Sequence, residues 1–175
     1  LVEYAMNNGG ISRYEKIRLF FEQIRHEPVS DDRVQLLAKR YSDLVKQKVI
    51  DAEPVRGSSE FLNKYHSDYD FAVVSGSDQE ELREVCRARK IDHFFIEILG
   101  SPAKKETNIA YLLAKTGWDK KKCLFVGDSI NDYDAAQKND IDFVARNAGL
   151  TDWGSVKTLS VVDDLSELDS FLKGD

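Results

Sequence analysis

The segment Leu124–Asp132 of this 175-residue chain reads Leu-Phe-Val-Gly-Asp-Ser-Ile-Asn-Asp. Its apolar run predicts a buried strand that ends at the turn residue Gly127. Asp128 and Asp132 follow at a spacing of four, where a helix is expected to begin. Two neighbouring carboxylates repel each other unless a cation or a proton relieves them, and Mg²⁺ prefers such oxygen ligands together with water and phosphate. The segment therefore predicts a metal site, with Asp128 as the ligand and Asp132 as its partner.

Outward from this segment, strands and helices alternate along residues 51–175. Apolar runs predict four strands and a further edge strand, separated by segments with helical spacing. This alternation predicts an α/β fold, a Rossmann-like parallel sheet with helices on both faces. Ligands bind such sheets outside the carboxyl ends of the strands. The expected strands are Phe71–Val74, Phe94–Ile98, Cys123–Val126, Asp142–Val144 and Leu159–Val162, and the expected helices lie near residues 58–66, 79–90, 102–116, 132–138 and 165–172.

The first 50 residues differ in character and predict a small α-helical unit. Apolar residues recur at helical spacing after Ser12, a suitable N-cap, and again from Asp31 to Gln47 after Ser30. The short connection between the two helices favours antiparallel neighbours. Residues 51–57 contain proline and glycine and are expected to form a linker. We therefore expect two units, a helical one over residues 1–50 and an α/β one over 51–175.

Two more polar segments follow expected strands. Ser75 and Gly76 come directly after one strand, where a hydroxyl and free backbone N–H groups can hold a phosphoryl oxygen. The alternative is that serines in this segment, Ser77 in particular, only cap the next helix. Lys104 and Lys105 fall in the first turn of a helix expected to begin at Pro102 after Ser101, where cations oppose the helix dipole. A bound phosphate would explain why two lysines stand at this position. The alternative is that they are a solvated pair without a ligand.

Composition narrows the classes of function. The chain is 42% hydrophobic and 32% charged, as in ordinary globular proteins, and its net charge of −6 argues against a nucleic-acid partner. No apolar run approaches the roughly 20 residues that span a bilayer. The two cysteines, Cys86 and Cys123, are expected to be reduced thiols. These features predict a cytoplasmic protein without membrane or nucleic-acid partners.

Taken in order, the three polar segments resemble the motifs of the haloacid dehalogenase superfamily, the type with a small α-helical cap. Ser75 matches the second motif, Lys105 (or Lys104) the third, and Asp128 with Asp132 the fourth. The resemblance implies a Mg²⁺-dependent phosphatase that hydrolyses a small phosphorylated metabolite through an aspartyl-phosphate, as a monomer or homodimer. It implies catalytic roles for Ser75, Lys105 and Asp132, a metal role for Asp128, and substrate binding by Ser75, Gly76 and Lys105. Arg13 and Lys16 could reach an anionic substrate from the cap, the alternative being a solvated helix face.

The nucleophile of that superfamily, the first aspartate of an Asp-x-Asp motif after a strand, has no counterpart at a strand end here. Asp68-Tyr69-Asp70 has the Asp-x-Asp pattern, but it precedes an expected strand instead of following one. The resemblance places the missing strand between those ending at Val74 and Val126, so we expect the natural protein to contain a further N-terminal stretch. Two alternatives stay open: a sugar-phosphate mutase of the β-phosphoglucomutase type, and a non-catalytic module without its nucleophile.

Overall fold

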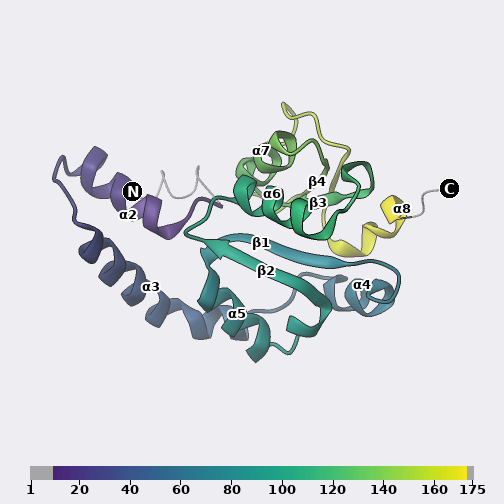
Figure 1. Cartoon of the computed structure of the whole chain (residues 1–175), viewed down its shortest axis with the longest axis horizontal. Helices are drawn as coiled ribbons and strands as arrows, with labels where there is room; N and C mark the ends of the chain where they lie inside the picture. The colour runs from purple at the N-terminus through teal and green to yellow at the C-terminus, as the bar shows by residue number, and fades with distance from the viewer. Residues whose placement is uncertain (1–9, 173–175) are drawn as a thin grey trace.

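The computed structural model describes residues 10–172, and these begin with a helical hairpin (residues 13–51). Helix α2 (Arg13–Leu19) runs into a π-helical turn, η1 (Phe20–Ile24), and the chain returns along α3 (Asp31–Asp51). Ser12 and Ser30 cap the two helices by accepting backbone N–H groups of the first turns. The expected helices and caps are confirmed, and α3 extends beyond the expected Gln47 to Asp51. Figure 1 shows the hairpin at one end of the molecule.

The rest of the described chain alternates between strands and helices, and every strand ladder is parallel. This arrangement confirms the α/β class, because parallel neighbours require a crossover and helices supply it. The elements are α4 (Ser58–Tyr65), β1 (Phe71–Asp78), α5 (Gln79–Ala88), η2 (Asp92–Phe94), β2 (Phe95–Ser101), α6 (Lys105–Thr116), η3 (Lys120–Lys122), β3 (Leu124–Gly127), α7 (Ile130–Lys138), β4 (Asp142–Arg146), β5 (Ser160–Val162), η4 (Leu165–Glu167) and α8 (Asp169–Leu172).

The strands between residues 10 and 172 form two hydrogen-bonded sheets. One contains β1 and β2, and the other has the order β3-β4-β5. Within residues 10–172, no strand pairs with the second edge of β1 or with the edge of β3 that faces away from β4. The two sheets nevertheless share a core, because Val74 of β1 and Phe125 of β3 pack against the same apolar cluster. Side chains therefore hold the two sheets together where backbone ladders do not.

Helices cover both faces of the three-stranded sheet, as expected (Figure 1). On one face, Ile109 of α6 and Ala135 and Ala136 of α7 pack against Phe143. On the other face, Phe61 of α4 packs with the C-terminal elements against a cluster around Val144. Val144 is 0% exposed, so β4 is buried on both sides.

Two expected helix starts are wrong, both at strand ends. β2 continues to Ser101, and α6 begins at Lys105 rather than Pro102, so Ser101 is a strand residue and not an N-cap. Similarly β1 extends to Asp78, whose Oδ1 accepts the N–H of Glu81 at 3.1 Å and caps α5 in place of Ser77. Asp and Ser are both favoured N-caps, and here the strand pairing of Asp78 with Ser101 decides where the helix starts.

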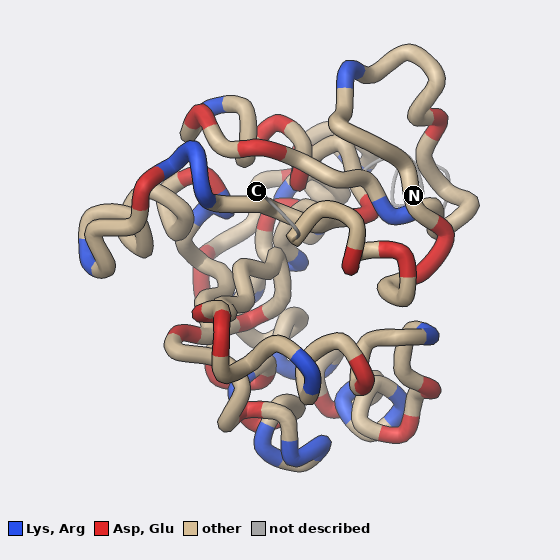
Figure 2. Tube along the Cα trace, turned by 90° about the vertical axis from the view of Figure 1, so that its right-hand side faces the viewer, with Lys and Arg blue, Asp and Glu red and all other residues tan. Residues whose placement is uncertain are grey.

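Charged residues of both signs are spread over the described chain. Figure 2 shows Lys and Arg interspersed with Asp and Glu along the trace. None of the helices between residues 10 and 172 combines the length and apolar character needed to cross a membrane.

Candidate functional site

The end of β3 is shaped by a glycine. A Cβ at Gly127 would lie 2.4 Å from the Cβ and 2.8 Å from Oδ2 of Asp132, closer than side chains approach each other. Only glycine at this position lets the first turn of α7 fold back onto the strand. Ser129 and Asp132 then cap α7 reciprocally, as in a capping box.

Asp132 is buried, 6% exposed, and both of its carboxylate oxygens are occupied. Oδ2 accepts the backbone N–H of Ser129 at 3.1 Å and its hydroxyl at 2.7 Å. Oδ1 lies 2.5 Å from Nζ of Lys105, and the side chains of this ion pair are only 10% and 9% exposed. A buried carboxylate with these partners fixes the position of the lysine.

Lys105 is the first residue of α6 and reaches across to α7. The residue before it, Lys104, is the N-cap position of α6 and is exposed. Of the two lysines that the sequence left open, Lys105 therefore contacts Asp132. The structure brings together two residues, 27 positions apart, that the sequence predicted for one site.

Asp128 differs from Asp132 because its side chain is 53% exposed. Its nearest charged partner is Arg146, whose Nη1 lies 3.6 Å from Oδ2. Thr151 donates a hydrogen bond of 3.0 Å to the backbone carbonyl of Asp128, which fixes the loop while the carboxylate stays open. An accessible carboxylate at a strand end fits Mg²⁺, which is held by one or two carboxylates and otherwise keeps water and phosphate oxygens. In the part of the chain that the structure describes, no three His, Cys, Asp or Glu residues gather into a fuller metal site.

Arg146 was not anticipated from the sequence. It is the last residue of β4, next to the end of β3. Its Nε is buried and has no hydrogen-bond partner within residues 10–172, while its Nη1 approaches Asp128. Sequence reasoning could have found Arg146 from its position directly after the apolar residues of an expected strand. The carboxyl ends of parallel strands lie at one edge of a sheet, so a cation there comes close to the other site residues.

Ser75 and Gly76 lie in the last part of β1 and meet the start of the helical hairpin. The hydroxyl of Ser75 accepts the N–H of Ser77 at 3.1 Å. A Cβ at Gly76 would lie 2.3 Å from the carbonyl oxygen of Gly10. A Cβ at Gly10, whose φ is +79°, would lie 2.5 Å from Oγ of Ser129 and 2.9 Å from Nζ of Lys105. The ends of β1 and β3 therefore meet at Gly10, with Lys105 beside them.

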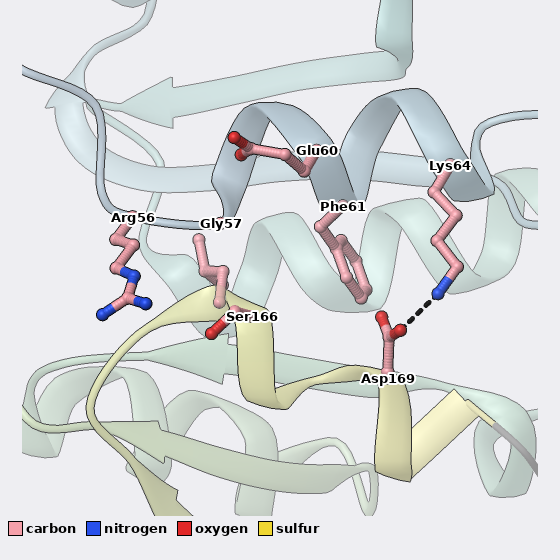
Figure 3. Close-up of a pocket in the computed structure, with 8 residues that line it drawn as sticks. Arg56, Gly57, Glu60, Phe61, Lys64, Ser166 and Asp169 are labelled. Atoms are coloured by element: carbon pink, nitrogen blue, oxygen red, sulfur yellow. Dashed lines mark hydrogen bonds and ion pairs between the residues drawn. The ribbon is translucent and has the colours of Figure 1, made fainter.

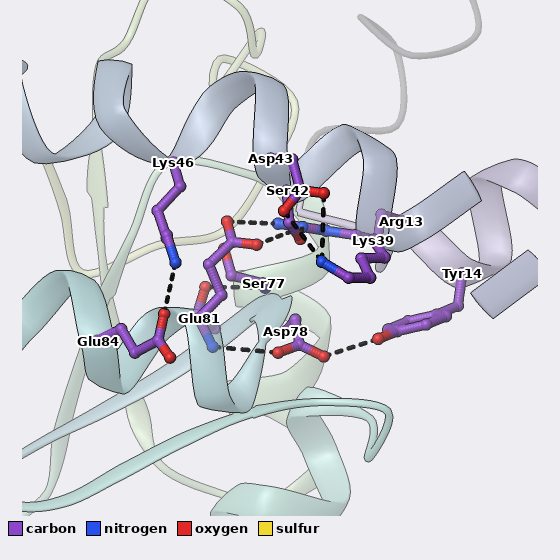
Figure 4. Close-up of polar contacts among 11 residues, drawn as sticks. Arg13, Tyr14, Lys39, Ser42, Asp43, Lys46, Ser77, Asp78, Glu81 and Glu84 are labelled. Carbon is purple, nitrogen blue, oxygen red and sulfur yellow. Dashed lines mark hydrogen bonds and ion pairs between the residues drawn. The ribbon is translucent and has the colours of Figure 1, made fainter. Parts of the chain in front are cut away.

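Arg13 pairs with the α/β unit in this conformation (Figure 4). Its Nη1 lies 2.5 Å from Oε2 of Glu81 and its Nη2 lies 3.0 Å from Oε1, in a bidentate pair that also includes Ser42 of α3. The two charged side chains are 12% and 10% exposed. Burial opposes the charge of Arg13, but the hydrogen bonds and charge of Glu81 outweigh it and raise the pKa of Arg13. Its guanidinium thus contacts Glu81 and not the ends of β1 and β3.

Two further contacts join the hairpin to α5. The hydroxyl of Tyr14 donates to Oδ2 of Asp78 at 2.7 Å, and Lys46 of α3 lies 2.7 Å from Glu84. Burial and then the hydrogen bond to Asp78 raise the pKa of Tyr14 to about 12. Sequence reasoning did not find these two contacts or the Arg13–Glu81 pair, because the paired residues lie 38 to 68 positions apart.

A separate hollow of about 340 Å³ lies between α4 and the C-terminal elements (Figure 3). Phe61 and Leu165 form its apolar part, and Lys64 is ion-paired with Asp169 at its side. None of the site residues predicted from the sequence lines it. It is a distinct feature from the edge where Lys105 and Asp128 gather.

Fold and site together define an α/β protein with buried and open carboxylates and a lysine at the carboxyl edge of parallel strands. The model of one family, haloacid dehalogenase-like hydrolases, matches residues 6–146, most of the chain. The chain therefore belongs to the haloacid dehalogenase-like hydrolase family, as its motifs indicated.

Known proteins that are similar in sequence or in structure are consistent with this family assignment. A phosphoglycolate phosphatase of Pasteurella multocida is 32% identical over 117 residues, which cover 62% of this chain and 51% of that protein. A predicted phosphoglycolate phosphatase from Haemophilus somnus superposes with a TM-score of 0.76 at 20% identity, covering 95% of this chain and 79% of that one. The HAD-hydrolase YfnB from Bacillus subtilis, bound to magnesium, gives 0.70 at 17% identity, covering 98% and 77%. The chain spans about a third to a half of the curated relatives it matches.

Proposed function

We propose that the whole protein is a Mg²⁺-dependent phosphatase that hydrolyses a small phosphorylated metabolite through an aspartyl-phosphate. The observation that carries this proposal is the buried Lys105–Asp132 pair at the edge where Ser75 and Asp128 also lie. The family and the relatives named phosphoglycolate phosphatase support it.

Each residue has a role that follows from its surroundings. Lys105 neutralises charge on the phosphoryl oxygens, and Asp132 is the positioning residue that holds it. The hydroxyl of Ser75 and the backbone at Gly76 bind the phosphoryl group, as free donors beside a strand end can. Asp128, with its open carboxylate, would hold Mg²⁺, which offsets negative charge on the phosphate when bound.

The attacking carboxylate is not one of the residues just described. Asp70 lies at the amino end of β1, where its Oδ2 accepts the indole N–H of Trp118 at 3.2 Å, far along the strand from Ser75. The cysteines do not substitute for it, because burial raises the pKa of both thiols. In the proposed reaction an aspartate of the whole protein displaces the alcohol from phosphorus, and water then cleaves the acyl phosphate to inorganic phosphate.

The first test is the substitution Asp128→Asn in the whole protein. It removes one negative charge from an exposed side chain, so we expect Mg²⁺-dependent hydrolysis of p-nitrophenyl phosphate to be lost while the fold is kept. Asp134→Asn, on the same helix as Asp132 but outside the site, is the control and should retain turnover. Undiminished hydrolysis by Asp128→Asn would refute the metal role. Transfer of phosphate within a sugar, without its release, would favour the mutase alternative.

A further inference from the structure

The backbone of Arg146 is held at the carboxyl edge of the three-stranded sheet from both sides. On one side, β4 pairs with β3, and Asp128 and Arg146 directly follow the last paired residues of that ladder. On the other side, Arg146 pairs with Val162 of β5, and the N–H of Asn147 donates to the carbonyl of Val162 at 2.7 Å. The sheet therefore sets the position of Arg146 beside the residue that follows β3.

The charged groups around Arg146 leave Asp128 as its partner. Nη1 of Arg146 lies 3.6 Å from Oδ2 of Asp128, and among the described residues no other carboxylate forms an ion pair with this guanidinium. Asp164 also interacts with the charge of Arg146. The carboxylate of Asp164, however, accepts hydrogen bonds from Ser166 and pairs with Arg56 at 3.8 Å. Arg146 is therefore available to Asp128.

This ion pair engages one side of the Asp128 carboxylate and leaves the other side open. The nearest approach is to Oδ2, and Oδ1 accepts no hydrogen bond from the described residues. At 3.6 Å the contact is longer than a hydrogen bond, so the guanidinium acts on the carboxylate through its charge. Mg²⁺ demands near-ideal octahedral geometry, and a half-exposed carboxylate that rotates freely is a poorer ligand than one held in a single orientation.

We propose that Arg146 is a positioning residue for the metal site, which orients Asp128 through one oxygen and leaves the other oxygen to Mg²⁺. This inference rests on the proposed function, which makes Asp128 the metal ligand, and adds the residue that orients it. Groups that hold a metal ligand in place typically contribute about 10- to 100-fold to metal affinity. A guanidinium suits this role because it stays charged at any working pH. If Arg146 only repelled the metal, its removal would have the opposite effect.

The test measures Mg²⁺ binding to the whole protein by isothermal titration calorimetry, without substrate. Arg146→Met keeps an apolar stem and removes the charge, so we expect the Kd for Mg²⁺ to rise at least about tenfold. Arg146→Lys keeps a cation and should recover part of the affinity. Arg56→Met is the matched control: it removes an exposed arginine that pairs with Asp164, and it should bind Mg²⁺ as wild type does.

Turnover gives a second readout of the same role. The Mg²⁺ concentration that gives half-maximal hydrolysis of p-nitrophenyl phosphate should rise in Arg146→Met by the factor found for the Kd. The KM for p-nitrophenyl phosphate at saturating Mg²⁺ should change much less, because Arg146 acts through Asp128. A rise in this KM with an unchanged Mg²⁺ requirement would overturn the proposal, since it would place Arg146 in contact with the substrate.

The remaining outcomes separate this proposal from its alternatives. Unchanged Mg²⁺ affinity in Arg146→Met would overturn it, and tighter binding would show that the guanidinium only repels the metal. A large loss of stability in both Arg146→Met and Arg146→Gln, measured by urea unfolding in EDTA, would also overturn it, because a partly exposed ion pair contributes little to stability. Wild-type protein that binds no Mg²⁺, or Asp128→Asn that binds it equally well, would refute the metal role in the proposed function itself.

Discussion

Asp132 and Asp128 have the same side chain, four residues apart, in opposite surroundings. Asp132 is buried and holds Lys105, whereas Asp128 is half exposed and faces Arg146. The difference arises because Asp132 lies in the first turn of α7, which folds back onto Gly127, while Asp128 precedes the helix. The two carboxylates at this edge therefore have different roles: Asp132 positions the cation of Lys105, and Asp128 is open to a ligand.

The buried pair predicts a large effect on stability. Asp132→Asn would leave Lys105 charged and without its partner in a buried position, so we expect the free energy of unfolding to fall by about 3–5 kcal/mol. Urea denaturation followed by circular dichroism measures it. The control is Asp43→Asn, which breaks the exposed Lys39–Asp43 pair and should cost less than about 1 kcal/mol. Equal losses in the two variants would show that Lys105 does not depend on Asp132.

At the scale of elements, the contact of α2 with α5 joins the helical hairpin to the α/β unit. Its central pair, Arg13 and Glu81, is bidentate and almost fully buried. Lys46 and Glu84 join α3 to the same helix but are 41% and 50% exposed. The two pairs both join the hairpin to α5, and they differ in burial and in the bidentate geometry of Arg13.

We expect a double-mutant cycle of Arg13→Met and Glu81→Gln to give a coupling energy of about 1–3 kcal/mol in urea unfolding. The cycle of Lys46→Met and Glu84→Gln should give less than about 1 kcal/mol, because both side chains are solvated. Similar couplings in the two cycles would mean that burial and bidentate geometry together do not strengthen the Arg13–Glu81 pair.

The same pair has a defined pH dependence. Burial acts to raise the pKa of Glu81, but the hydrogen bond and charge of Arg13 outweigh it, so the pKa lies below the ordinary 4.5. A carboxyl group with a lowered pKa contributes stability that is complete above its unfolded pKa and is lost as the pH falls through its folded pKa. The stability difference between wild type and Glu81→Gln should therefore be constant from pH 7 to about 5 and shrink below pH 4.5. A difference that grows on acidification would contradict this assignment.

Over the whole molecule, the divided sheet predicts unequal protection of backbone amides. β4 is paired on both sides and contains the fully buried Val144 and Ala145, whereas among the strands of residues 10–172 β1 pairs with β2 alone. We expect the amides of β4 to exchange hydrogen most slowly and those of β1 and β2 to exchange through a separate, easier opening. Hydrogen exchange followed by NMR measures both sets. Uniform protection across the five strands would show that they unfold as one unit.

The sequence predicted the elements of the fold better than the contacts between them. Apolar runs and N-caps placed the parallel strands and both hairpin helices, because these depend on neighbours within a few residues. The ordered motifs predicted that Lys105 and Asp132 belong to one site, and the structure places them in contact. The engagement of Arg13 by Glu81 depends on packing between distant segments, for which the local pattern carries no signal. The place of Arg146 at the end of an apolar strand was a local signal, but its approach to Asp128 again depends on how separate strands pack. Strand pairing likewise moved the start of α6 from Pro102 to Lys105.

Intolerance to mutation in this chain can arise from steric contact alone, as at Gly10, Gly76 and Gly127. None of them has a functional group, yet a single methyl group at each would collide with the backbone or with a side chain of the site. In a saturation-mutagenesis screen these positions should be as intolerant as Lys105. Sensitivity to substitution would therefore identify every residue on which the shape of the site depends. A separate activity assay would be needed to distinguish the reactive side chains from the glycines that allow them to approach one another.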